Sequence, residues 1–82
     1  MMESDYSPEK LEEASRYEIV VIWDNNDGIF VARMPELPGV VIHADTPEEA
    51  TSHAIRAGAD WLAAERAFGH AVPAPKSMLL AR

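Results

Sequence analysis

Apolar side chains form short continuous runs in the first half of the chain and recur at helical spacing in the second half. Residues 17–23 and 29–34 are rich in β-branched and aromatic side chains, which favour a pleated strand over a helix. Between them lies a run of Asp, Asn and Gly, in which Gly28 is best suited to the left-handed backbone that closes a hairpin. The pattern predicts an antiparallel hairpin.

The first predicted strand is apolar on both of its faces. Trp23 ends one face, whereas Val20 and Ile22 belong to the other, because successive side chains of a strand point to opposite sides. A strand of this kind lies either in the centre of a sheet or at an interface between subunits. The sequence leaves both positions open.

Two prolines interrupt the pattern after the second strand. Pro35 and Pro38 lack a backbone N–H group and have a restricted φ angle, so the chain between them cannot continue a strand ladder. We therefore expect Glu36 and Leu37 to be held out in a stiff connection. Gly39 then allows the backbone to turn into a third strand over residues 40–43.

One long helix is predicted from about residue 47 to residue 68. The Thr46 hydroxyl can accept a hydrogen bond from the Glu49 backbone, the Glu49 side chain can reach back to Thr46, and Pro47 suits the first helical position. Gly69 is a suitable stop after the helix. Gly58 costs about 1 kcal/mol relative to alanine within a helix, which indicates the close approach of a neighbouring group.

An apolar stripe on this helix is expected to pack on the sheet, with small residues near its start and large aromatic residues filling its wider end. The stripe consists of Ala50, Ala54, Ala57, Trp61, Ala64 and Phe68. At the two ends of the chain the signals are shorter. Ser7 and Pro8 can begin a short helix, and residues 78–80 are an apolar segment suited to an edge strand or to contact with a second subunit.

Composition narrows the class of protein. Eighty-two residues allow one small domain, and the absence of cysteine excludes disulfides and thiolate metal sites. Such a small domain needs other reinforcement, so we expect self-association or partner binding. The net charge of −7 disfavours direct contact with nucleic acid and suits a basic partner, although surplus carboxylates also serve solubility. No apolar run is long enough to span a membrane and the N-terminus is acidic, so the cytoplasm is the expected compartment.

Acidic residues gather at strand ends and loops, where two-metal nucleases place their carboxylates. They are Asp24, Asp27, Glu36, Asp45, Glu48 and Glu49. Turn formation and the positive end of the helix dipole explain most of them, so we expect no metal and no cofactor. His43, His53 and His70 lack the spacing of metal ligands. Trp23 and Trp61 are interpreted as core or interface residues, and the chain as a binding or assembly module rather than an enzyme.

Five segments in this order and at this spacing resemble the HicB antitoxin domain. They are Tyr17-Glu-Ile-Val-Val-Ile-Trp-Asp24, Asp27-Gly-Ile-Phe-Val-Ala32, Pro35-Glu-Leu-Pro-Gly39, Asp45-Thr-Pro-Glu-Glu-Ala50 and Val72-Pro-Ala-Pro75. The resemblance covers roughly residues 16–76, which leaves residues 1–15 as a tail or short helix and residues 77–82 as a C-terminal tail. Its motif residues are expected to have structural roles: Tyr17, Trp23, Gly28, Phe30, Pro35, Leu37, Pro38, Gly39, Thr46, Pro47, Glu49 and Ala50.

The resemblance implies an α+β fold of β-β-β-α-β order, with a three- to four-stranded, mainly antiparallel sheet and one long helix packed on it. This is a partly degraded ribonuclease H-like fold without nuclease activity. The family role it implies is to bind and neutralise HicA, a small basic toxin that cleaves messenger RNA, by covering the surface that holds the toxin's catalytic histidine. An acidic module facing such a surface gains association rate and blocks RNA from the same site.

Two departures from the family pattern stand out. Val40 and Ala44 occupy positions where many members have cysteine and glycine. Many members also continue into an operator-binding domain, whereas this sequence ends at Arg82, so we expect a short form that does not itself bind nucleic acid.

For the toxin-facing surface we expect the acidic groups around the hairpin and the proline turn, namely Glu18, Asp24, Asp27 and Glu36. A homo-oligomer, dimer or tetramer, is also expected. Two alternatives stay open. One is an orphan HicB-like assembly module without a toxin, and the other is a residual metal-dependent ribonuclease that uses some of Asp24, Asp27, Asp45 and Glu48.

Overall fold

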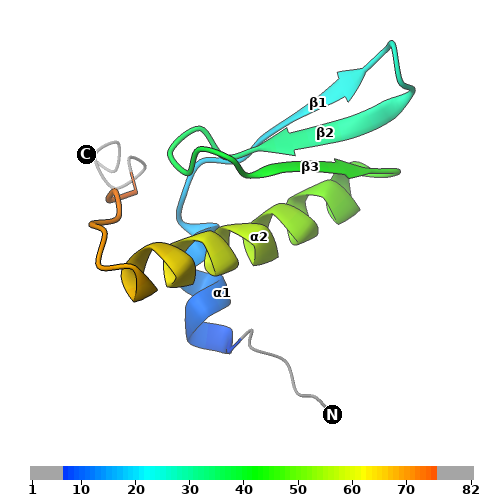
Figure 1. Cartoon of the computed structure of the whole chain (residues 1–82). Coiled ribbons are helices and arrows are strands. Elements are labelled where there is room, and N and C mark those ends of the chain that lie inside the picture. The colour runs from blue at the N-terminus through cyan, green and yellow to red at the C-terminus, as the bar shows by residue number, and fades with distance from the viewer. Residues whose placement is uncertain (1–6, 76–82) are drawn as a thin grey trace, which may run out of the picture.

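A three-stranded antiparallel sheet and two helices make up the computed structural model, which describes residues 7–75 (Figure 1). The elements in chain order are α1 (Pro8–Ser15), β1 (Val20–Asp24), β2 (Ile29–Arg33), β3 (Val41–Ala44) and α2 (Pro47–Ala67). Helix α2 lies along one face of the sheet, and α1 packs against α2 rather than against the strands. The predicted α+β class is confirmed, whereas the segment 78–80 lies outside the described residues.

The predicted hairpin turn and the predicted start of the long helix are both present. The hairpin between β1 and β2 is closed by the Asp24 side chain, whose Oδ1 accepts from the backbone N–H groups of Asn26 (2.9 Å) and Asp27 (3.2 Å). Gly28 adopts a φ angle of 65°, the left-handed conformation that the turn requires. Helix α2 begins at the predicted position, because Thr46 Oγ1 accepts from the Glu49 backbone at 3.1 Å.

Strand register gives the sheet two unlike faces. Positions Val21, Ala32 and Ile42 lie side by side on the face toward α2. On the opposite face, which no element of residues 7–75 covers, Ile22 lies beside Val31 and His43. The sheet order is β1-β2-β3, so β1 is an edge strand and β2 takes the centre. The sequence allowed the first strand to lie either in the centre of a sheet or at an interface between subunits. Within the described residues, the prediction of a central position is wrong.

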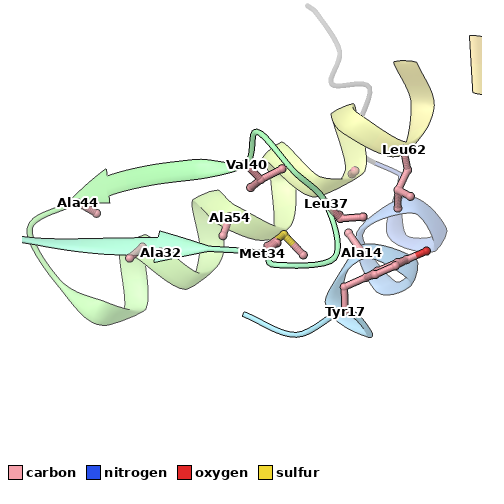
Figure 2. Packing of buried hydrophobic residues seen from close by; sticks show 11 residues of the cluster. Ala14, Tyr17, Ala32, Met34, Leu37, Val40, Ala44, Ala54 and Leu62 are labelled. Atoms are coloured by element: carbon pink, nitrogen blue, oxygen red, sulfur yellow. The ribbon is translucent and has the colours of Figure 1, made fainter. Parts of the chain in front are cut away.

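The core is densest where the proline turn meets the helices. Met34, Leu37 and Leu62 are the largest fully buried side chains, and Figure 2 shows Leu37 and Leu62 gathered with Ala14 and Tyr17 between the turn and the two helices. A Cβ atom at Gly58 would lie 2.9 Å from the sulfur of Met34 and 3.3 Å from a methyl carbon of Leu37. The predicted close approach at Gly58 is confirmed.

The predicted helix stripe is wrong in the second half of α2. Ala50 and Ala54 are buried as expected, but the stripe continues through Gly58 to Leu62. Phe68 is 75% exposed and Trp61 is only half-buried. The reason is that Met34 and Leu37 already fill the wider end of the layer, while the last turn of α2 extends past the strands (Figure 1).

Truncation of Leu62 is expected to destabilise the domain far more than truncation of Phe68. Leu62→Ala leaves a cavity in the core and should lower the free energy of unfolding by about 3 kcal/mol. Phe68→Ala removes an exposed side chain and should change it by less than about 0.5 kcal/mol. Urea denaturation measures the free energy of unfolding of both variants. Equal losses would instead support the predicted stripe that ends at Phe68.

An ion pair links helix α1 to the C-terminal end of α2. Arg66 donates to both carboxylate oxygens of Glu13, at 2.9 and 2.6 Å. This hydrogen-bonded guanidinium holds the pKa of the Glu13 carboxyl below its ordinary value of 4.5. The pair therefore stabilises the fold fully above pH 4.5, and the contribution is lost as the pH falls through the lowered pKa.

A Glu13→Gln variant is expected to be less stable than the wild type at pH 7, and the gap should narrow as the pH falls below 4.5 and the wild-type carboxyl takes up its proton. The difference between the two denaturation midpoints, followed as a function of pH, is the measured quantity. Glu9→Gln, an exposed change on the same helix, is the control. A gap that does not narrow on acidification would show that the carboxylate charge does not contribute to the stability of α1.

Candidate protein-binding surface

Glu36 does not belong to an exposed acidic surface. The proline turn points its side chain inward, where 9% of the residue is accessible to solvent. Its Oε1 accepts a hydrogen bond of 2.8 Å from the backbone N–H of Glu18. The expectation that Glu36 is held out in the connection is wrong, because an unpaired backbone donor at the start of the sheet draws the carboxylate in. Glu36 thus joins the turn to the residues that lead into β1.

The other three predicted acidic residues stand at the two ends of β1. Glu18 is exposed just before the strand, Asp24 ends it, and Asp27 is exposed in the hairpin turn. At about 3.3 Å per residue, Glu18 and Asp24 are about 20 Å apart along the chain direction. The structure therefore does not bring the predicted residues into one cluster. It places them on either side of an apolar strand.

The strand between these carboxylates exposes large apolar side chains on both of its faces. Val20 is 37%, Ile22 50% and Trp23 52% accessible. The Trp23 ring meets Phe30 edge to face, with centroids 4.9 Å apart, and its indole N–H donates to the Asn25 side chain at 3.4 Å. Trp23 was given a structural role from the sequence. Its accessibility makes it the main functional candidate, and the apolar pattern on both faces of the strand was the available signal.

A second group of carboxylates lies near the hairpin. Asp45, Glu48 and Glu49 are exposed at the junction of β3 and α2, and this junction is at the same end of the molecule as the hairpin tip (Figure 1). Glu48 and Glu49 occupy the first turn of α2, where the helix dipole favours negative charge. This end of the domain is acidic on two neighbouring elements.

Other polar groups of residues 7–75 do not assemble into a reactive centre. The three histidines lie apart, on β3, on α2 and after the helix, where His70 Nδ1 is 2.9 Å from a Glu65 carboxylate oxygen. Within this range no group of three or more His, Asp or Glu side chains could hold a metal ion. No helix of the described part of the chain is both long enough and apolar enough to cross a bilayer. An open groove between α1 and α2 has Leu11 and Ile55 among its lining residues.

The motif residues Leu37 and Tyr17 are both buried. The expectation that Leu37 is held out in the connection is wrong, because its apolar side chain is fully buried in the core beside Gly58. Its backbone hydrogen bonds to Met34 (2.9 Å) and Val40 (3.1 Å) shape the proline turn. Tyr17 is buried too, and its hydroxyl donates to the backbone carbonyl of Pro73. Burial raises the pKa of this phenol above 10.0.

Comparison of the chain with models of protein families, with curated proteins and with solved structures finds no match in any of the three. The chemistry of the candidate surface is that of an exposed apolar strand between acidic ends. Acidic groups flank it, and exposed apolar side chains lie between them, with Trp23 next to Asp24 at the end of the strand.

Loss of the Glu36 carboxylate is expected to weaken the fold rather than remove a binding contact. Glu36→Ala leaves the Glu18 N–H without this acceptor and should lower the free energy of unfolding by about 1–3 kcal/mol. Glu36→Gln keeps an acceptor oxygen and should lose less. Urea denaturation distinguishes them, and equal losses in the two variants would show that the charge, not the acceptor, matters.

Proposed function

We propose that this chain is a HicB-like antitoxin that binds a small basic HicA-type toxin and neutralises its cleavage of messenger RNA by covering the toxin's active surface. The proposal includes the partly degraded ribonuclease H-like fold, a cytoplasmic location and a non-enzymatic role. The observation that carries it is the surface of β1, where the exposed apolar side chains are flanked by the exposed carboxylates of Glu18 and Asp27.

The physical case starts from charge. A net charge of −7 on 82 residues attracts a basic protein over several ångströms and raises the rate of association. Carboxylates alone would give a weak and salt-sensitive complex, because exposed ion pairs contribute little. Trp23 supplies what charge lacks, since tryptophan at the centre of an interface is among the residues that contribute most to affinity.

The order of elements supports the same proposal. A hairpin, a proline turn, a third strand and a capped long helix follow each other along the chain as the five HicB-like segments require. Asp24, one of the carboxylates that a nuclease would need, is engaged in another role, because its side chain closes the hairpin. The chain is thus better suited to blocking an RNA-cleaving protein than to cleaving RNA.

An orphan assembly module is the second candidate, and one observation favours it. The sheet face away from α2 exposes Val20, Ile22 and Val41, and no described element covers it. A small domain with such a face gains stability by self-association. In this case the homo-oligomer would itself be the functional form.

Co-expression with the protein encoded in the adjacent reading frame, which the proposal requires to be small and basic, tests the first proposal. We expect the two chains to elute together in size-exclusion chromatography and the complex to lack the RNA cleavage of the basic protein alone. Replacing Glu18 and Asp27 by lysine should slow association about tenfold at low salt, because it reverses the charge at both ends of β1.

Glu9→Lys combined with Glu12→Lys, two exposed charge reversals on α1, changes the net charge by the same amount and should slow association much less. The antitoxin proposal fails if the basic protein neither binds nor is inhibited. A stable homo-oligomer that persists at micromolar concentration under the same conditions would then favour the assembly module.

A further inference from the structure

β1 lacks the features by which proteins protect a free sheet edge. An edge strand turns every second backbone N–H and C=O group away from its single neighbour, and natural proteins guard such edges with lysine, proline, bulges or very short strands. The stretch from Val20 to Trp23 contains neither a charge nor a proline. Its five pairs with β2 follow one register without a bulge. Among residues 7–75 no strand pairs with this edge.

Side chains on both faces of β1 are available to an added strand. Val20 and Ile22 are exposed on the open face, and Trp23 is exposed on the face toward α2. The other edge strand, β3, differs, because Val41 is its single exposed large apolar residue and His43 follows close by. The two edges of the sheet are therefore not equivalent, and β1 is the edge better suited to contact with an added strand.

We propose that the free edge of β1 accepts an extended segment of a basic protein as a fourth strand, with Trp23 as the apolar anchor. The inference rests on the proposed function, and it specifies how the basic partner is held. Backbone hydrogen bonds along the edge would supply affinity, while alternate side chains of the added segment would contact the two faces.

Charge distinguishes a basic partner from a second copy of this chain. In a symmetric antiparallel pairing of two β1 strands, paired residues share a face. If Val20 pairs with Ile22 of the second copy, Glu18 then faces Asp24 of that copy. Sliding the strands by two residues in one direction places Val20 opposite Asp24, and in the other direction it places Glu18 opposite Ile22. All three arrangements also join two chains that each carry a net charge of −7.

A segment with an apolar centre and cationic ends has none of these conflicts. Its centre would meet Val20, Ile22 and Trp23, and its lysine or arginine residues would meet Glu18 at one end and Asp27 at the other. Cationic side chains near Trp23 also gain from the face of the indole ring. The chemistry of the edge thus selects a basic protein.

A matched pair of lysine substitutions tests which edge is used. Ile22→Lys and Val41→Lys both place a charge at an exposed apolar position on the open face, but on opposite edges. We expect Ile22→Lys to weaken binding of the basic protein from the adjacent reading frame about tenfold or more. Val41→Lys should stay within about twofold. Calorimetry measures both affinities, and circular dichroism checks that both variants fold.

Hydrogen exchange identifies the mode of binding. Amides of residues 20–24 should gain protection in the complex, whereas those of residues 41–44 should not. Equal affinity of Ile22→Lys and wild type would overturn the docking edge and leave the antitoxin proposal standing. Protection of the β1 edge in the isolated chain would overturn it as well. If that protection depends on concentration, a second copy is the occupant, and otherwise the chain's own residues outside 7–75 cover the edge.

A synthetic peptide tests the edge without the natural partner. The probe has alternating valine and threonine with lysine at both ends, and the matched control has glutamate at the ends. In a Trp61→Phe background, in which Trp23 is the remaining tryptophan, the lysine peptide should change the fluorescence and the glutamate peptide should not. If the lysine peptide binds but the neighbouring basic protein does not, the antitoxin proposal fails and the docking edge stands. If neither peptide binds, the edge is not a strand acceptor.

Discussion

The contact between α2 and the proline turn determines where every other part of the domain can lie. At Gly58 the helix comes so near to Met34 and Leu37 that a single added carbon would meet the sulfur at 2.9 Å. Ala50 and Ala54 extend the same close approach toward the start of the helix. Because these small residues bring the helix axis near the sheet, α2 is held tightly over β2 and β3.

One helix cannot cover three strands. A helix with its side chains is about 10 Å wide, whereas three strands with about 4.8 Å between neighbours need a wider cover. Tight packing of α2 over β2 and β3 therefore leaves β1 at the margin of the layer, where Trp23 is half exposed. The exposed aromatic strand follows from the same geometry that makes the core compact.

Features that depend on neighbouring residues could be predicted from the sequence, and features that depend on distant ones could not. The Thr46 cap and the Gly28 turn are local, so residue types and spacing were sufficient. The orientation of Glu36 depends on a backbone donor 18 positions away, and the exposure of Phe68 depends on where the sheet ends. The acidic residues at both ends of β1 could be identified from their charge. The distance between them could be given only once the structure had placed them at opposite ends of one strand.

The hydrogen bond from Tyr17 to Pro73 connects the two ends of the described chain. After α2 the backbone returns to the beginning of the sheet, so a segment more than fifty positions from Tyr17 in sequence is packed beside it. A protease that removed the residues after α2 would uncover a buried phenol and loosen the approach to β1 without cleaving the sheet. The burial of Tyr17, three residues before β1, is in this way tied to the segment after α2.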